Sequence, residues 1–164
     1  MNEYYIKSIK DEILLEKLIH YSELYKEKIP KQFHETIKIN LSFLKNKSKS
    51  LEDIYNNSKY IFSYELNENQ IQKIDKSKLN IIKDIYSLIK KDKNISKDYL
   101  KSIFDKIIET EKINFKDLGQ PLRIILTGSE YGPAIYDIAN SLGLDEFLKR
   151  LELFFSKIDK NIKN

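Results

Sequence analysis

Apolar side chains recur every three or four residues along most of the chain, which is the spacing that places them on one face of an α-helix. Pro30 suits the first turn of such a helix, because proline lacks an N–H that this turn leaves unpaired anyway. Ser50 and Asp53 read as a weak capping box that opens a further helix. The first two apolar stripes are Leu14, Leu18, Tyr21 and Tyr25, and Phe33, Ile37, Leu41 and Leu44.

The same spacing continues after residues 64–77, a polar and aperiodic stretch that we expect to be a connection. Ser96 is expected to cap one of the later helices. No alternating strand pattern of useful length occurs. The sequence therefore predicts an all-α chain with two consecutive helical subdomains, residues 1–66 and 67–164. The stripes beyond the connection are Ile82, Ile85, Tyr86 and Ile89, and Leu100, Ile103, Phe104, Ile107 and Ile108.

Glycine and proline predict where the last helices begin and end. Gly119 interrupts the apolar pattern, and a short helix is expected over about Pro121–Thr127, with Gly128 at its C-terminal end. Pro133 is expected to begin the next helix, which ends at Gly143. The final helix carries Leu144, Phe147, Leu148, Leu151, Phe154 and Phe155.

Composition removes several classes of protein. The 164 residues include no cysteine, which excludes disulfide scaffolds, zinc–thiolate centres and cysteine nucleophiles. The two histidines, His20 and His34, stand at no recognised metal-ligand spacing and are expected to be structural. No apolar run approaches the roughly 18 residues of a membrane span, and the N-terminus lacks the apolar core of a signal peptide. We therefore expect a cytoplasmic protein that holds no metal and binds no membrane.

Catalytic chemistry finds no support in the sequence. The four glycines do not match the spacing of a dinucleotide-binding or phosphate-binding loop. The carboxylates are explained by solvated helix faces, and none forms the environment-shifted pair that acid–base chemistry requires. An independent enzyme is therefore the weakest hypothesis.

The densest basic segment contains Lys45, Lys47 and Lys49, in a chain whose formal net charge is +4. Lysine ammonium groups neutralise phosphates without reading sequence, so this segment could hold a nucleic-acid backbone. The cations also suit a solvated helix C-terminus, where they interact favourably with the helix dipole. Both interpretations stay open.

Arg123 stands out because the chain has only one other arginine, Arg150. The apolar residues around Arg123 form one helix face, so its side chain is expected to point away from that face, beside a Thr-Gly-Ser turn. The planar five-donor fork of arginine suits a base edge or a phosphate. The alternative is a structural arginine that caps carbonyl groups or pairs with Glu130 or Asp137.

The segment around Arg123 resembles a known family. It reads Gln-Pro-Leu-Arg-Ile-Ile-Leu-Thr-Gly, then Gly-Pro-Ala-Ile-Tyr-Asp-Ile through Leu-Gly. This order and spacing are similar to the C-terminal anticodon-binding region of bacterial glutamyl-tRNA synthetase. Tyr5-Ile6 and residues 45–51 also resemble segments of that region. The resemblance covers essentially the whole chain, and about residues 118–143 are specific.

The resemblance implies an all-helical reader of the tRNA(Glu) anticodon loop. Its partner in the same polypeptide would be a catalytic half that uses ATP and Mg to attach glutamate to the tRNA, and this chain itself would hold no cofactor. The family's base contacts fall on Arg123 and on Gly132, which replaces a frequent threonine. Pro133 and Ile135 would form an apolar floor for a base.

The resemblance also gives the lysines a role. Lys47 stands where the family has a base-reading arginine, and Lys45 and Lys49 would hold the RNA backbone. The alternative function is a helical protein-interaction module that docks a synthetase or tRNA-processing partner.

Overall fold

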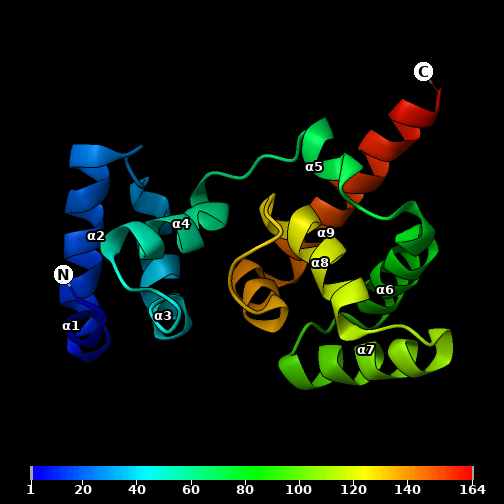
Figure 1. Cartoon of the computed structure of the whole chain (residues 1–164), viewed down its shortest axis with the longest axis horizontal. Coiled ribbons are helices and arrows are strands. Elements are labelled where there is room, and N and C mark those ends of the chain that lie inside the picture. Colours follow the sequence, from blue (N-terminus) through cyan, green and yellow to red (C-terminus); the bar gives the residue numbers. More distant parts are fainter. Residues whose placement is uncertain (1, 164) are drawn as a thin grey trace. The chain divides into compact units, whose positions relative to one another are not determined.

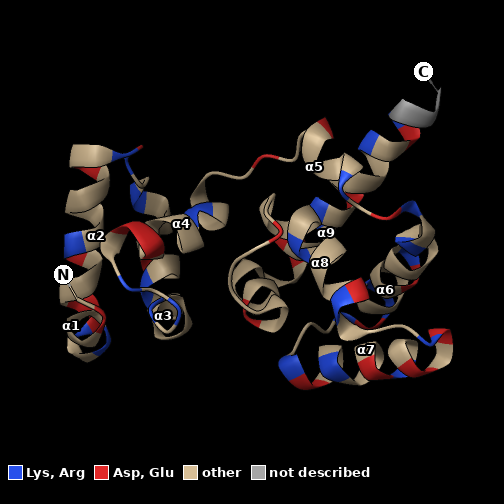
Figure 2. Ribbon diagram, in the orientation of Figure 1, with Lys and Arg blue, Asp and Glu red and all other residues tan. Residues whose placement is uncertain are grey.

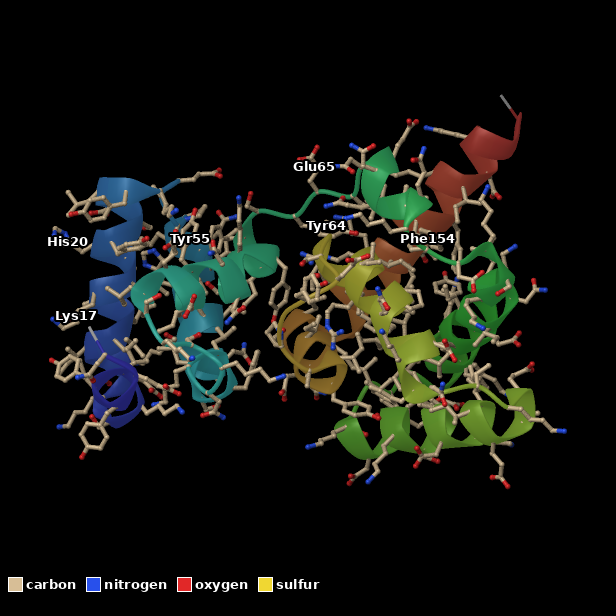
Figure 3. All side chains as sticks on the ribbon, in the orientation of Figure 1. Lys17, His20, Tyr55, Tyr64, Glu65 and Phe154 are labelled. Atoms are coloured by element: carbon tan, nitrogen blue, oxygen red, sulfur yellow. The ribbon has the colours of Figure 1, made fainter. Side chains whose placement is uncertain are left out.

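The computed structural model describes residues 2–163, with side chains described through residue 160. Within this part every regular element is helical, which confirms the predicted all-α fold (Figure 1). The chain divides into two compact units, Met1–Tyr64 and Glu65–Asn164. Tyr64 and Glu65, the residues on either side of the division, are labelled in Figure 3.

The first unit consists of α1 (Glu3–Ser8), α2 (Asp11–Tyr25), α3 (His34–Leu44) and α4 (Leu51–Phe62), with a 3-10 turn, η1 (Lys31–Phe33), before α3. Helices α2, α3 and α4 pack against one another. Burial of the two predicted stripes holds this packing together, although Tyr25 at the end of one stripe is 70% exposed. The fully buried side chains are Leu14, Leu18, Ile37, Leu41, Leu44 and Ile54.

The start of α4 confirms the predicted cap. The Ser50 hydroxyl accepts a hydrogen bond from the Asp53 N–H across 3.1 Å. The Asp53 carboxylate accepts from the N–H of Lys49 across 2.9 Å, one residue before the usual partner of a capping box. The prediction for Pro30 is wrong, because this residue precedes η1 and lies outside the first turn of α3.

The second unit contains α5 (Glu68–Gln72), a 3-10 turn η2 (Lys76–Lys78), α6 (Leu79–Asp92), α7 (Lys97–Glu111), α8 (Phe115–Thr127) and α9 (Ile135–Lys163). Helix α9 packs against α6, α7 and α8, and α5 contacts α8. Phe154 of α9, labelled in Figure 3, is fully buried in this core. Other buried members are Ile82, Ile85, Phe104, Leu122, Ile125 and Phe147.

The prediction that residues 64–77 are only a connection is wrong, because α5 and the start of η2 lie within them. Helix α5 begins with a capping box: the Gln70 N–H donates to the Asn67 side chain across 3.1 Å, and the Asn67 N–H donates to the Gln70 side chain across 2.7 Å. Leu66 and Ile74, on either side of α5, are buried. The capping box and the two buried residues Leu66 and Ile74 hold this short helix. Because two apolar residues do not make a helical repeat, the sequence shows no apolar stripe there.

Helix α8 is longer than the predicted helix over Pro121–Thr127, and Gly119 lies inside it. The helix starts at Phe115 because Asn114 and Asp117 form a capping box, in which the Asn114 N–H donates to the Asp117 carboxylate across 2.8 Å. A Cβ atom on Gly119 would lie 3.3 Å from Cε1 of Phe115, so the missing side chain at Gly119 leaves room for the Phe115 ring against the helix. Pro121 removes one helical N–H donor without ending the helix.

The end of α8 and the break in α9 agree with the predicted glycine positions. Gly128 ends α8 in the left-handed region with φ of 78°, and Gly143 breaks α9 with φ of 81° and ψ of 167°. The predicted start of α9 at Pro133 is wrong by two residues. The carbonyl of Ala134 accepts the N–H of Ile138 across 3.0 Å, and α9 begins at Ile135.

Candidate nucleic-acid interface

The segment that joins α8 to α9, residues 128–134, is held by its own polar groups. We call it the α8–α9 turn. The Thr127 hydroxyl donates to the carbonyl of Arg123 across 2.7 Å and accepts the N–H of Ser129 across 3.1 Å. The Ser129 hydroxyl accepts the N–H of Tyr131 across 3.2 Å. These short-range bonds satisfy backbone groups that a surface turn otherwise leaves to water.

Arg123 spans the same turn from the body of α8. Its Nε donates to the carbonyl of Pro133 across 3.3 Å, and its Nη1 donates to the carbonyl of Glu130 across 3.4 Å. Within the described part of the chain, Arg123 forms no ion pair with Glu130 or Asp137, so the carbonyl-capping alternative describes this state. Burial lowers the pKa of the half-buried guanidinium, which nevertheless stays charged at neutral pH.

Arg150, the other arginine, reaches the same region from α9. Its Nη1 donates to the carbonyl of Leu126 across 2.6 Å, and its Nε donates to the Glu146 carboxylate across 3.0 Å. The Leu126 carbonyl belongs to the last turn of α8, where helical partners run out. Arg150 is only 4% exposed. Sequence reasoning missed this role, although the rarity of arginine was the available signal.

Gln70 ties α5 to the start of the turn. Its Nε2 donates to the carbonyl of Gly128 across 2.5 Å. A Cβ atom on Gly128 would lie 2.7 Å from the Glu65 carbonyl oxygen and 2.9 Å from Gln70 Nε2. Together with the positive φ, this close approach explains why the position holds glycine. The α8–α9 turn is therefore anchored by Arg123 and Gln70, while Arg150 holds the last turn of α8 that precedes it.

The structure brings four predicted site residues together in the second unit, but these residues differ in their exposure to solvent. Arg123 and Gly132 are partly exposed, whereas Pro133 is buried and Ile135 is 2% exposed. Nothing lies within 4 Å of the place where a Cβ atom of Gly132 would be, so the backbone there is open to approach. In this state Ile135 supports the turn from the core.

The predicted lysines lie in the first unit, on the loop between α3 and α4, where Figure 2 shows blue segments. Lys45 is held inside that unit: its Nζ lies 2.9 Å from the Asp11 carboxylate, and its side chain is 17% exposed. Lys47 and Lys49 are exposed. Between them, buried Ser48 donates to the Leu44 carbonyl across 2.7 Å. Two of the three lysines are thus available to a ligand.

His34 is held by a contact within the first unit. His34 Nε2 lies 3.0 Å from the Ile29 carbonyl oxygen, a structural contact. Among the described residues, no group of three or more His, Cys, Asp or Glu side chains could hold a metal ion. In the same part of the chain, no helix is both long and apolar enough to cross a membrane. Figure 2 shows acidic and basic residues interspersed along the helices of each unit.

Comparison with known proteins assigns the chain to a family. Residues 13–155 match the family described as "Anticodon binding domain". The chain belongs to this anticodon-binding domain family. The anticodon-binding domain is 43% identical over 153 residues to the glutamate–tRNA ligase of Pelagibacter ubique, covering 92% of this chain and 33% of that protein. It is 30% identical over 171 aligned positions to the glutamate–tRNA ligase of Wigglesworthia glossinidia brevipalpis, covering 99% of this chain and 35% of the relative.

Solved structures agree with the helical fold of the anticodon-binding domain. The crystal structure of a glutamate tRNA ligase from Elizabethkingia meningosepticum superposes with a TM-score of 0.72 and 18% identity, covering 94% of this chain and 31% of that chain. A glutamate–tRNA synthetase from Elizabethkingia anophelis gives a TM-score of 0.67 and 19% identity. The chain spans about a third of the length of the curated relatives it matches.

Proposed function

We propose that this anticodon-binding domain binds the anticodon loop of tRNA(Glu) as the C-terminal part of a glutamate–tRNA ligase. Membership of the family and the similarity to curated glutamate–tRNA ligases support the proposal. The observation that carries it is the α8–α9 turn, in which Arg123 is fixed through two backbone carbonyls. A charged group that is fixed before binding loses less conformational entropy when its ligand arrives.

Arg123 has donors to spare for RNA. Its contacts with Pro133 and Glu130 use two of the five N–H groups of a guanidinium, which leaves one on Nη1 and both on Nη2. Anticodon-loop bases are unpaired and can be splayed out and read on their edges. The free N–H groups of Arg123 would bind such an edge or the adjoining phosphate, while the bound ones keep the fork oriented.

The neighbouring residues shape the contact. Gly132 leaves the backbone uncovered, so a ribose or a base can approach closely. Pro133 in the turn and Ile135 at the start of α9 are buried, and they would form the apolar floor beneath a bound base. A side-chain hydroxyl is absent at Gly132, so this position would contribute close approach without a hydrogen-bonding side chain.

The first unit would contribute phosphate contacts. Lys47 and Lys49 are exposed and can neutralise phosphates, a contact that is favoured by release of the counterions condensed on the RNA. Lys45 is paired with Asp11 and would mainly fix the loop that carries the other two. In the proposed division of the chain into subdomains 1–66 and 67–164, the first would hold the RNA backbone and the second would carry the contacts to the bases.

Catalysis belongs to the remainder of such a ligase. We propose that ATP, Mg and glutamate are bound outside this chain, in a catalytic half that uses ATP to attach glutamate to the tRNA in the cytoplasm. This domain would select the tRNA and hold it. Its own residues would therefore affect the ligase through tRNA affinity and not through the chemical step.

The test is binding of the chain to tRNA(Glu) and to a transcript that differs only in its anticodon, over about 50 to 200 mM salt. The expected result is tighter binding to tRNA(Glu), with Arg123→Ala reducing affinity by about 5- to 100-fold and lowering the preference. Equal affinity for both transcripts at every salt concentration would refute anticodon recognition. Capture of a synthetase partner together with no tRNA binding would establish the protein-interaction alternative.

A further inference from the structure

Tyr131 lies at the tip of the α8–α9 turn, beside a pocket of about 190 Å³. The pocket is lined by Gln70 and Lys73 at the end of α5, and by Gly128, Ser129, Glu130 and Tyr131 of the turn. We call it the Tyr131 pocket. Its volume lies below the range of roughly 300–1,000 Å³ for sites that enclose a small molecule. A ligand of this pocket would therefore insert one group and leave its remainder outside.

The Tyr131 ring is presented to solvent by a hydrogen-bonded turn. It is 82% exposed, and within the described part of the chain it pairs with no other aromatic ring. Its N–H is bound by the Ser129 hydroxyl, and the carbonyl of the preceding Glu130 is bound by Arg123. An aromatic side chain has only two side-chain torsions, so a tyrosine on a fixed turn binds a flat partner at low entropic cost.

The polar lining matches the parts of a nucleotide. Lys73 is exposed and supplies a cation for a phosphate. Glu130 supplies an acceptor for the exocyclic amine of a base, and its negative charge disfavours a phosphate alone in the pocket. Gln70 is fixed by its bonds to Asn67 and Gly128, which leaves one amide N–H to donate. The tyrosine face supplies stacking, which every base can accept.

We propose that the Tyr131 pocket is a stacking site for one unpaired RNA nucleotide, with the base on the Tyr131 ring and its phosphate on Lys73. The proposal rests on the proposed function insofar as the RNA is the tRNA bound by the α8–α9 turn. It adds a contact beyond Arg123, Gly132, Pro133 and Ile135. Tyr131 and Arg123 then act on the same turn, because Arg123 fixes the backbone from which the ring projects.

The absence of tryptophan from the sequence makes a direct test possible. Tyr131→Trp introduces a single tryptophan, whose emission can be excited apart from that of the tyrosines, and preserves an aromatic face at the pocket. Tyr4→Trp is the matched control, since Tyr4 is 81% exposed and lies in the first unit. Each variant is titrated with the tRNA(Glu) transcript while affinity is measured independently by anisotropy of a labelled tRNA.

Stacking of a base on the indole ring is expected to quench the Tyr131→Trp emission, saturating at the dissociation constant found by anisotropy. The Tyr4→Trp emission is expected to stay constant. If the Tyr131→Trp chain binds tRNA normally without a change in emission, the stacking site is refuted and the proposed function stands. If the unmodified chain binds neither transcript, the proposed function and the stacking site both fail.

Affinity gives a second readout that does not depend on the fluorophore. Tyr131→Ser should weaken binding of tRNA(Glu) by about 5- to 100-fold, whereas Tyr131→Phe keeps the stacking face and should bind as the unmodified chain does. Lys73→Gln should reduce the slope of log affinity against log salt by about one, and Lys101→Gln, an exposed lysine on α7, should not. Equal affinity of Tyr131→Ser and Tyr131→Phe would overturn the proposal.

Discussion

The Nε of Arg123 lies 3.3 Å from the carbonyl oxygen of Pro133, ten residues later in the chain, and donates a hydrogen bond to it. A second donor of the same guanidinium reaches the carbonyl of Glu130. One side chain of α8 therefore holds both ends of the Glu130–Pro133 segment. This contact links the structural role of Arg123 to its proposed role in RNA binding, because the free donors are oriented by the bound ones.

Replacing Arg123 by lysine tests this double contact. A lysine ammonium is a point charge that cannot reproduce the planar fork, so Arg123→Lys should lower the free energy of unfolding by about 1 kcal/mol. Urea unfolding followed by circular dichroism measures the change. The control is Glu130→Gln, which should be neutral, since Arg123 is bonded to the Glu130 backbone. A larger loss in Glu130→Gln than in Arg123→Lys would show that a side-chain ion pair matters instead.

Arg150 should matter more for stability than for RNA binding. It is 4% exposed and donates to the Leu126 carbonyl across 2.6 Å, so Arg150→Ala should cost about 2 to 3 kcal/mol. Lys149→Ala, an exposed neighbour on α9, should change stability little. Thermal and urea unfolding of both variants gives the comparison. Similar stabilities for the two variants would mean that the end of α8 does not need Arg150.

The lysines of the first unit should differ in how strongly each one contributes to the salt dependence of RNA binding. Lys47→Gln and Lys49→Gln should each reduce the slope of log affinity for tRNA(Glu) against log salt by about one. Lys45→Gln should change the slope less, because its ammonium is paired with Asp11. The measurement is the affinity of each variant for tRNA(Glu) over about 50 to 200 mM salt, from which the slopes are compared. A larger change in slope for Lys45→Gln than for the other two would reverse the assignment.

Tyr99 gives the second unit a dependence on alkaline pH. Burial, together with the hydrogen bond to Asp92, raises the pKa of Tyr99 to about 12, above the value of about 10 for an unfolded chain. The unfolded state therefore loses this proton first, and the contribution of Tyr99 to stability is present below pH 10 and lost as the pH rises toward 12. The Tyr99 hydroxyl lies 2.7 Å from the Asp92 carboxylate and 3.2 Å from the Leu88 carbonyl.

The measurement is urea unfolding of the unmodified chain and of Tyr99→Phe at several values between about pH 9 and pH 12. The unmodified chain should be more stable at the lower end, and the difference between the two should shrink as the pH rises. A constant difference across the range would show that Tyr99 titrates alike in both states.

The sequence predicts the fold well in the segments whose helices are held by buried apolar side chains. The stripes of α2, α3 and α6 could be predicted because leucine and isoleucine recur with the helical period and are buried. Helix α5 and the first turn of α8 depend on capping boxes at Asn67 and Asn114, which stabilise a helix without an apolar stripe. Pro121 predicts a helix start, whereas the structure places it inside α8, where its tolerance depends on the surrounding packing.

The sequence predicts the site only in part, because the contacts of the site join segments that are distant in the chain. Arg123 could be chosen from its rarity and its place off the apolar face. The bond from Arg150 to the Leu126 carbonyl spans 24 residues, the bond from Gln70 to Gly128 spans 58, and the pair of Lys45 with Asp11 spans 34. Sequence periodicity carries no information on such tertiary pairings, so these anchors emerge only from the folded chain.

Footprinting of tRNA(Glu) in the presence of the chain tests the central claim most directly. The tRNA is probed with a single-strand-specific nuclease and with hydroxyl radicals, free and at saturating concentrations of the chain, and again with Arg123→Ala. We predict protection of the anticodon loop and its adjoining stem, which weakens in the variant. Protection confined to another part of the tRNA, or an anticodon loop that stays reactive at saturation, would contradict the account.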